Sequence, residues 1–427
     1  LPLRKRTIRK FGLEYCDVQT MLWNVSVMLR ALILNIDGRN KKPIPMISYI
    51  LAVSVCLGYF YVYLVSMSWF VFVRCSATGD LLAAIIVFSL GVSSEIGTVK
   101  LVYMFIDKVR EIVKECLACD SSVVADSRFS KNLLRTLRHV KKRAMVFWVV
   151  IIGNGVVYIL KPAILPGRHF PEDKFILFGL EPMDEDPNYQ IASILFTAGV
   201  IFTCYVPANI TAFLIVVTGY IEAQMLSLTE ELLHVREDAE EHYNKTNRPI
   251  IILDTADTLR RRSVLDNNKT DDDLKNEAIN DYIEKRLKEI IRTHGRNINL
   301  LAQVETVFSG AIALEFFLLV VGLIAELLGG LENTYIEIPF ALMQVGMDCF
   351  TGQRVMDASV KFETAVYDSK WENFSTANMK IILTMLQSSQ KTMKLSAGGI
   401  IMLSSSCLMQ VIRSIYSAYT TLRSTMK

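Results

Sequence analysis

Ionisable side chains inside long apolar stretches are the residues of this chain whose positions could do chemistry. They are Glu95, Lys100, Glu305, Glu315 and Asp348. Burying a charge in a hydrocarbon environment costs at least ~2.5 kcal/mol, so each of these groups needs a partner or a purpose. Two interpretations are open. The groups pair across helices or face a water-filled cavity, or they contact a ligand or an ion directly.

Patterns typical of enzymes and metal sites do not occur in the sequence. The five histidines form no His-Glu-x-x-His pair, and no glycine-rich phosphate loop precedes a Lys-Ser/Thr pair. Cys116 and Cys119 form a single Cys-x-x-Cys pair without a nearby histidine, which is more typical of two ordinary thiols than of a metal site. We therefore expect no enzyme activity, no cofactor, no metal site and no nucleic-acid partner.

Seven apolar stretches must position the ionisable residues. Hydrophobic residues make up 52% of the chain and the mean hydropathy is +0.33, whereas roughly 45–50% is usual in soluble proteins. About 20 helical residues cross the bilayer core of about 30 Å. The stretches are Ile47–Val73, Leu81–Ile106, Ala144–Ile164, Ile191–Tyr220, Leu300–Leu328, Ile338–Val366 and Gly398–Leu422. The predicted fold class is an all-α membrane protein with seven transmembrane helices.

The distribution of charges predicts the orientation in the membrane. Residues 1–46 and the loop after the second stretch are rich in Lys and Arg, whereas the loop 167–190 is acidic and residues 331–337 contain no base. Because basic loops stay on the cytoplasmic side, we predict a cytoplasmic N-terminus and an extracellular C-terminus.

Two other classes of polytopic membrane protein are alternatives. A G-protein-coupled receptor has the opposite orientation, and neither its Asp-Arg-Tyr nor its Asn-Pro-x-x-Tyr motif occurs at the expected places. A secondary transporter would be favoured by inverted repeats or by spans broken by Gly or Pro in matching halves, and neither is visible.

Helical periodicity also predicts segments outside the membrane. Residues 1–46 form a cytoplasmic segment with an interfacial helix over Phe11–Ile36. Spans one to four occupy 47–225, and residues 226–299 hold cytoplasmic extensions of the fourth and fifth spans around a mobile linker at Asn244–Asp273. Spans five and six occupy 300–375, a cytoplasmic helix occupies 376–397, and the last span lies within 398–427.

Several motifs resemble those of insect odorant receptors, and in particular those of the moth sex-pheromone receptor branch. They are Ser93-Ser94-Glu95-Ile96-Gly97, Asn154-Gly155-Val156-Val157-Tyr158, Gly219-Tyr220-Ile221-Glu222-Ala223-Gln224-Met225, Ala365-Val366-Tyr367-Asp368-Ser369-Lys370-Trp371, and the loop pieces Pro166-Gly167-Arg168-His169, Gly179-Leu180-Glu181-Pro182-Met183 and Pro187-Asn188-Tyr189. Ile415-Tyr416-Ser417 departs from the Ser-Tyr-Ser run common in such receptors.

The resemblance implies the tuning subunit of a heterotetrameric, ligand-gated, non-selective cation channel, assembled with a shared odorant co-receptor in the plasma membrane of sensory dendrites. It implies that the cytoplasmic parts of helices four to seven form an anchor domain and that the final helix lines the pore. The implied pore and gate residues are Ile412, Ile415, Tyr416, Tyr419, Leu422 and Arg423.

The resemblance also implies an odorant pocket in the outer half of the bundle, between the second, third, fourth and sixth spans. The implied lining residues are Ile85, Phe88, Ser89, Asn154, Val157, Tyr158, Ile194, Leu195, Ala198, Phe202, Phe340, Met343, Gln344 and Met347. These mainly apolar side chains suit a long-chain volatile ligand, and a few neutral polar groups could bond an alcohol, aldehyde or acetate head group. Membrane lipid is the other expected partner.

Overall fold

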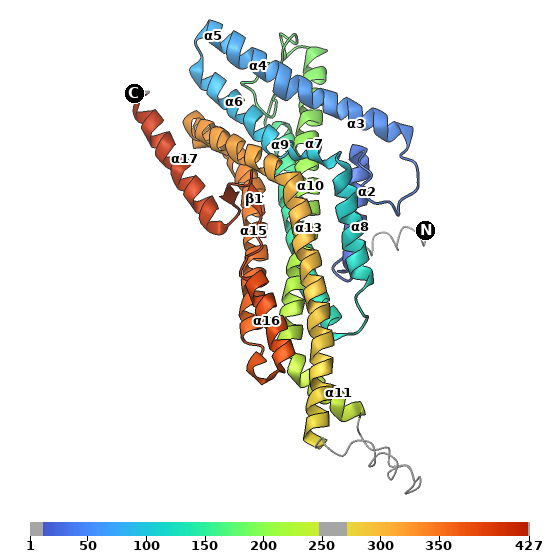
Figure 1. Ribbon diagram of the computed structural model, residues 1–427. Helices are drawn as coiled ribbons and strands as arrows, with labels where there is room; N and C mark the ends of the chain where they lie inside the picture. Colours follow the sequence, from blue (N-terminus) through green and yellow to red (C-terminus); the bar gives the residue numbers. More distant parts are fainter. Residues whose placement is uncertain (1–11, 247–270, 426–427) are drawn as a thin grey trace.

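The computed structural model of the protein describes residues 12–246 and 271–425, and these residues fold almost entirely into helices (Figure 1). This confirms the predicted all-α fold class. The predicted linker at Asn244–Asp273 lies for the most part outside the described residues, since α11 extends to Thr246 and α13 starts at Asp271.

The elements of the first half begin with α2 (Val18–Leu29) and the short η1 (Arg30–Leu32). One continuous helical rod then comprises α3 (Met46–Tyr59), η2 (Phe60–Ser66), α4 (Met67–Trp69), η3 (Phe70–Arg74) and α5 (Cys75–Thr78). It is followed by α6 (Leu81–Ile96), α7 (Lys100–Met104), α8 (Asp107–Ser121), α9 (Arg128–Ile164), α10 (Asn188–Leu233) and α11 (Val235–Thr246).

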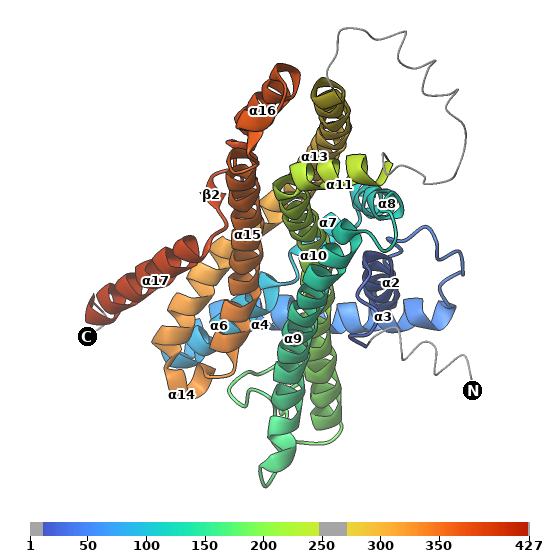
Figure 2. The same ribbon diagram turned by 90° about the horizontal axis from the view of Figure 1, so that it is seen from below.

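The second half contains α13 (Asp271–Gly329), α14 (Leu331–Thr334), α15 (Glu337–Tyr367), η4 (Trp371–Asn373) and α16 (Thr376–Ser389). A hairpin of β1 (Ser396–Ala397) and β2 (Ile401–Met402) then leads into α17 (Ser405–Thr425). In both ribbon views α17 lies at the edge of the bundle, while α16 lies beside the start of α13 (Figures 1 and 2).

Two helices are much longer than a bilayer is thick. The 59 residues of α13 and the 46 residues of α10 span about 88 Å and about 69 Å at 1.5 Å per residue, against a hydrocarbon core of about 30 Å. Their lower parts form a narrow stalk with α11 and α16 (Figure 1). α10 continues past the predicted end of the fourth span at Tyr220 to Leu233, and α13 begins before the predicted start of the fifth span at Leu300. α10 packs against α9, α15, α3 and α13, and its middle is buried throughout.

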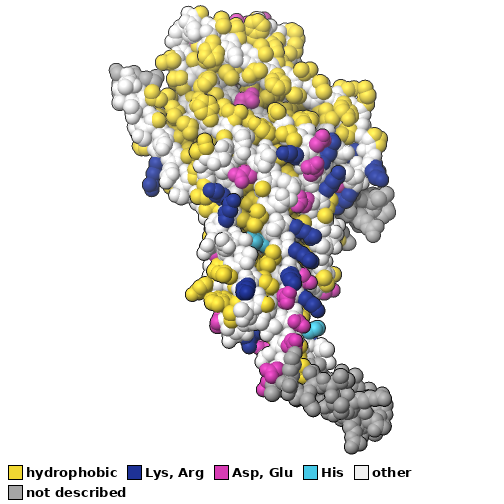
Figure 3. All heavy atoms as spheres, viewed as in Figure 1, with side chains coloured by type: hydrophobic (Ala, Val, Ile, Leu, Met, Phe, Trp, Pro, Cys, Tyr) yellow, Lys and Arg dark blue, Asp and Glu magenta, His cyan; other side chains and the backbone are white. Residues whose placement is uncertain are grey.

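Side-chain chemistry divides the molecule in the same way as its shape does. Hydrophobic side chains cover the wide part of the face in Figure 3, whereas Lys, Arg, Asp and Glu gather on the stalk. Within the described residues, five helical segments are long and apolar enough to cross a membrane: Met46–Thr78, Leu81–Met104, Arg128–Ile164, Asn188–Leu233 and Asp272–Gly329. They contain the first five predicted spans, except for the last two residues of the second. The predicted sixth and seventh spans coincide with α15 and α17, which are more polar, so their membrane crossing stays a prediction.

Three predicted boundaries were wrong. A turn at residues 97–99 divides the second span, because Thr98 Oγ1 donates to the carbonyl of Glu95 (3.0 Å) and competes with the helix bonds. The helix predicted over 376–397 ends at Ser389. The last helix starts at Ser405 rather than at Gly398, because Gly398 and Gly399 adopt φ of 63° and 76° and turn the chain into the hairpin.

The helix predicted over Phe11–Ile36 is shorter in the structure. Only Val18–Leu29 forms α2, with Asp17 as its N-cap through a 2.8 Å bond from the Thr20 amide. One face of α2 is buried against α10 and α8.

Three of the ionisable residues singled out above meet in one buried cluster. Lys100 Nζ of α7 lies 2.9 Å from Glu315 Oε2 of α13 and 2.7 Å from Asp348 Oδ2 of α15, and all three side chains are at most 5% exposed. Thr211 of α10 lies 3.4 Å from the same nitrogen. These residues therefore pair across helices, which is the first of the two interpretations given above.

The remaining two ionisable residues also have partners. Glu305 of α13 accepts a hydrogen bond from Ser396 of the hairpin, and Glu95 accepts one from Thr98 of its own turn at 3.1 Å. The structure thus provides each of these five residues with a polar contact, as the cost of burial requires.

Replacing Lys100 with Met should lower the free energy of unfolding by about 3–5 kcal/mol, because it leaves two carboxyl groups buried without their cation. The measurement is thermal unfolding of the full chain in detergent. The exposed Lys108 → Met serves as the control and should have little effect. Adding Glu315 → Gln and Asp348 → Asn to Lys100 → Met should recover much of the loss. An unaltered melting temperature for Lys100 → Met alone would contradict a structural role of the cluster.

Candidate ligand-binding site

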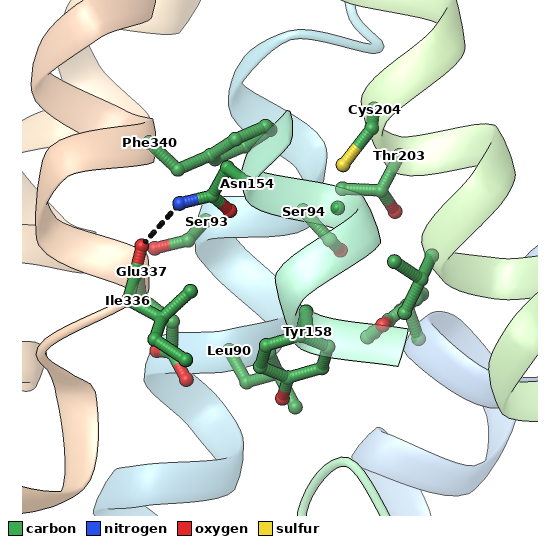
Figure 4. Close-up of a pocket in the computed structure, with 13 residues that line it drawn as sticks. Leu90, Ser93, Ser94, Asn154, Tyr158, Thr203, Cys204, Ile336, Glu337 and Phe340 are labelled. Atoms are coloured by element: carbon green, nitrogen blue, oxygen red, sulfur yellow. Dashed lines mark hydrogen bonds between the residues drawn. The ribbon is translucent and has the colours of Figure 1, made fainter. Parts of the chain in front are cut away.

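A buried cavity lies in the wide part of the bundle, between α6, α9, α10, the start of α15 and η2 (Figure 4). Its volume is about 40 Å³. It is lined by Tyr63, Leu90, Ser93, Ser94, Asn154, Gly155, Tyr158, Val200, Thr203, Cys204, Ile336, Glu337 and Phe340. The side chains labelled in Figure 4 belong to α6, α9, α10 and α15, apart from Ile336 directly before α15, and they surround the same space.

Close contact between α9 and α10 shapes one wall of the cavity. Gly155 of α9 lies directly against Cys204 of α10, and a Cβ at this glycine would lie 2.6 Å from the cysteine Sγ. Only glycine fits this approach. Tyr158 follows one turn later on the same face of α9 and is 7% exposed, so the two helices hold its phenol inside the bundle.

Hydrogen bonds fix the polar side chains on the α15 side of the cavity. Asn154 donates from Nδ2 to the Ile336 carbonyl at 3.0 Å, the bond drawn in Figure 4. Ser89 Oγ lies 3.3 Å from Glu337 Oε2, and Ser93 donates to Glu326 of α13. Two buried carboxyl groups therefore lie close to the cavity, each with a serine hydroxyl as partner.

Two hydroxyl groups beside the cavity lack such partners. Tyr158 Oη and Thr203 Oγ1 are buried and have no hydrogen-bond partner among the described residues. Gln344 lies one turn after Phe340 on α15 and is fully buried. Neither its amide oxygen nor its amide nitrogen has a hydrogen-bond partner among the described residues. A buried polar group without a partner is costly, so these groups are available to a polar atom of a ligand or to water.

The cavity is too small for a large ligand in this conformation. A volume of about 40 Å³ accommodates about three water molecules at ~10–15 Å³ each, whereas typical ligand sites have ~300–1,000 Å³. A molecule of more than a few heavy atoms can enter only if the surrounding side chains or helices move.

The structure brings three of the predicted pocket residues to this cavity, namely Asn154, Tyr158 and Phe340. Two more are close to it by contact: Ser89 reaches Glu337, and Gln344 continues the same face of α15. Phe202 is buried beside the cavity wall and packs on Tyr59 with ring centroids 4.6 Å apart.

The other predicted pocket residues do not line the cavity. Val157 and Ile194 are 57% and 68% exposed and point away from the bundle. Leu195 and Ala198 pack against Gly58 of α3. Ile85 is half-buried, and Phe88, Met343 and Met347 are half-buried and pack elsewhere against the core.

Sequence reasoning missed ten of the lining residues. Tyr63 belongs to the first span, which had no place in the implied pocket, and Glu337 precedes the predicted start of the sixth span. Thr203 and Cys204 lie one and two residues after the predicted Phe202. An acidic residue directly before an apolar stretch was the one available signal for Glu337.

The predicted gate residues lie on α17 and differ in exposure. Ile415 is buried against the rest of the chain, whereas Tyr416 and Leu422 are 63% and 42% exposed. Arg423 is exposed and donates to the Tyr419 hydroxyl at 2.7 Å, and the rings of Tyr416 and Tyr419 are 6.3 Å apart. Ile412 is half-buried. One side of α17 therefore packs on α13 and α15 and the other is open.

The loop between α9 and α10 folds onto the end of the bundle. Phe170 and Phe175 pack on Phe196 of α10, with ring centroids 5.7 and 5.6 Å away. Burial raises the pKa of Glu172, and Lys161 opposes the shift. His169 bonds Asp173 at 2.9 Å, which raises the pKa of the imidazole.

Membrane-length helices around an internal cavity define a polytopic membrane protein, and in residues 12–246 and 271–425 no group of His, Cys, Asp or Glu is arranged to hold a metal ion. The family model described as 7tm Odorant receptor matches residues 80–325 and 333–416. The chain therefore belongs to the 7tm odorant receptor family, which is a family of receptors rather than of enzymes.

Solved structures give the same fold. The insect olfactory receptor OR5 from Machilis hrabei is similar to this chain with a TM-score of 0.72 and 13% sequence identity, covering 96% of this chain and 99% of the receptor. Its complex with eugenol matches with a TM-score of 0.70 and 12% identity, covering 96% and 100%. Among curated proteins, none matches the chain in sequence.

Two substitutions at the cavity should differ in their effect on stability. Asn154 → Leu leaves the Ile336 carbonyl without its donor and should cost about 1–3 kcal/mol. Tyr158 → Phe removes a hydroxyl that has no protein partner, so it should leave the free energy of unfolding unchanged or raise it. Thermal unfolding of both variants in detergent is the measurement. A loss for Tyr158 → Phe as large as that for Asn154 → Leu would show that the phenol is bonded in the folded protein.

Proposed function

We propose that this chain is the ligand-binding, tuning subunit of an odorant-gated cation channel. The observation that carries the proposal is the buried cavity between four helices of an odorant receptor fold, with unpaired hydroxyl groups at Tyr158 and Thr203. The solved relative that binds eugenol supports a small volatile ligand for this fold. The family match gives no support to the alternative of a G-protein-coupled receptor.

The proposed ligand is a long-chain volatile molecule with an alcohol, aldehyde or acetate head group. Most of the cavity wall is apolar, with Leu90, Val200 and Phe340 among its residues, which suits a hydrocarbon chain. Either unpaired hydroxyl could bond an oxygen of the head group, so the ligand would satisfy a polar group that folding leaves without a partner. The resemblance to moth sex-pheromone receptors favours the same ligand class.

The proposed orientation places the charged stalk in the cytoplasm and the loop between α9 and α10 outside the cell. Support comes from the basic residues before the first span and after the second, which favour the cytoplasmic side. The acidic loop 167–190 and the end of α17 are then extracellular. The plasma membrane of sensory dendrites is the proposed location.

The proposed partner is a shared odorant co-receptor, with which the chain forms a heterotetramer. Support comes from α17, whose open side carries Tyr416 and Leu422 as exposed large hydrophobic residues. In the proposed channel this side faces the pore and neighbouring subunits, and its bulky side chains exclude water from the closed pore. Residues of α16 and of the lower part of α13 form the proposed anchor between subunits.

Currents recorded from cells that express this chain with and without the co-receptor test the proposal. We expect ligand-dependent cation currents with both subunits when long-chain alcohols, aldehydes and acetates are applied in turn. Silence towards every ligand class, with the chain present at the cell surface, would contradict the assignment as a tuning subunit.

The same recordings locate the ligand. Thr203 → Phe adds bulk inside the cavity and should shift the preference towards shorter chains, by roughly fourfold in affinity for each methylene displaced, because each buried methylene contributes ~0.8 kcal/mol. Ile194 → Phe adds bulk to the exposed side of the same helix and is the matched control. If the two variants rank the ligands identically, the cavity is not the ligand site.

Replacing Tyr419 with Ala should raise the ligand-independent current or alter ion permeability while the ranking of ligands stays unchanged. The reason is that this variant removes a bulky group from the proposed gate and touches no residue of the cavity. Tyr335 → Ala, which removes an exposed tyrosine ahead of α15, is the control. A basal current and ion selectivity equal to those of the unmodified channel would place Tyr419 outside the gate.

A further inference from the structure

A second pocket, larger than the first, lies in the stalk between α9, α10, α11 and α13 and the turn after α8. Its volume is about 570 Å³, within the ~300–1,000 Å³ range of small-molecule sites. We call it the stalk pocket. Four arginines line it, namely Arg128, Arg286, Arg292 and Arg296, together with three carboxylates. Nothing in the proposed odorant function accounts for it.

Two of the four arginines are held by the carboxylates. Arg128 Nε bonds Glu231 Oε1 at 3.0 Å and its Nη1 bonds Asp238 at 3.0 Å. Arg286 bonds Glu289 at 2.6 Å and also reaches Glu231. These pairs use all three carboxylates and fix the two guanidinium groups as walls of the stalk pocket.

The other two arginines have no acidic partner. Arg292 and Arg296 are exposed at their place in the pocket wall, and no ion pair or hydrogen bond joins either to another described residue. They are four residues apart on α13, so they project from the same helix face with Cβ atoms about 5–6 Å apart. Two guanidinium groups at this spacing match the oxygens of one phosphate group.

Two further features of the pocket suit a phosphorylated polyol. The first turn of α9 lines it with Ser127, Arg128 and Phe129, and the N-terminus of this 37-residue helix favours an anion. Gln224 of α10 also lines it and is 1% exposed, and its Oε1 is buried without a hydrogen-bond partner while its Nε2 bonds Tyr220. This oxygen accepts a hydrogen bond, so it calls for a ligand that carries a donor such as a hydroxyl group.

We propose that the stalk pocket binds a hydroxyl-bearing phosphate monoester of the inositol phosphate class, with Arg292 and Arg296 on a phosphate and Gln224 on a ring hydroxyl. The ligand is either a soluble inositol phosphate or the head group of a phosphorylated inositol lipid. The pocket is at a height that permits both, because Arg296 precedes the apolar stretch that begins at Leu300 by about 6 Å along the helix. Basic side chains also gather over α13 on the face of the stalk seen in Figure 3.

Binding to the purified full chain tests this inference without any odorant or co-receptor. Inositol trisphosphate is titrated onto the chain in detergent, and the chain in nanodiscs is compared with phosphatidylinositol bisphosphate and with phosphatidylserine at matched negative charge. The variant is Arg292 → Gln with Arg296 → Gln. Neither side chain has a partner to lose, so the fold should be retained. Arg135 → Gln with Arg138 → Gln removes the same charge from exposed positions of α9 outside the pocket and is the matched control.

We expect saturable binding of the inositol compound. Its affinity should fall at least about tenfold in the variant of Arg292 and Arg296, because each charge-assisted hydrogen bond contributes about that factor. The affinity should be unchanged in the control variant. Gln224 → Met should weaken inositol trisphosphate binding and leave pyrophosphate binding unchanged. Binding confined to nanodiscs with phosphatidylinositol bisphosphate would identify the lipid head group as the ligand. Binding of inositol trisphosphate alone would identify a soluble inositol phosphate as the ligand. Equal losses in both arginine pairs, equal binding of phosphatidylserine, or no binding of either inositol compound would overturn the proposal.

Discussion

One buried ammonium group shared by two carboxyl groups holds the middle of this bundle together. Lys100 joins Glu315 and Asp348 within 2.9 Å, and the three residues belong to three different helices. In a bundle of membrane-length helices, apolar contacts favour one packing of the helices over another only weakly, because lipid is as apolar as a neighbouring helix. A paired charge does distinguish among them, because any arrangement that separates the pair leaves a charge in an apolar medium. The positions of α7, α13 and α15 therefore depend on this cluster more than on any single apolar contact.

The second constraint is that α10 and α13 each run through two different environments, the apolar bundle and the charged stalk. Above Leu300, α13 buries Val304, Phe308 and Leu319 in the bundle, and below it Arg286 and Glu289 belong to a network of ion pairs in the stalk. On α10, Glu222 marks the equivalent change, since it is 1% exposed and pairs with Arg143 at 2.5 Å and with Arg354 at 2.7 Å. Ion pairs replace apolar packing where α10 and α13 pass from the hydrophobic bundle into the stalk. Each continuous helix therefore has side chains suited to the bundle in one part and to the stalk in the other.

The sequence predicted the helices far better than it predicted the cavity. Hydropathy and helical period suffice to find the membrane-length parts of α9, α10 and α13, because both signals persist over many residues. The part of α9 before Ala144 was not predicted as helix. The start of α17 was missed because two glycines with positive φ turn the chain at a place where apolar residues continue. Pocket residues depend on the rotation of each helix about its axis, and one residue changes this by about 100°. Thus Phe202 was predicted while the next residue, Thr203, lines the cavity, and of the predicted neighbours Val157 and Tyr158 only Tyr158 lines it.

The helix α15 joins the three places on which the proposed function depends. Glu337 at its start lines the cavity, Asp348 in its middle belongs to the buried ion cluster, and Gln353 accepts a hydrogen bond from the Ser405 amide at the start of α17 (3.2 Å). The first two are 11 residues apart (348 minus 337), or about 16 Å along the helix. A cavity of about 40 Å³ must widen to take a large ligand, and a rigid helix in its wall carries any displacement along its own length. If the cavity is the ligand site, α15 is therefore a single continuous helix between the ligand and the hydrogen bond to α17, with Asp348 of the ion cluster between them.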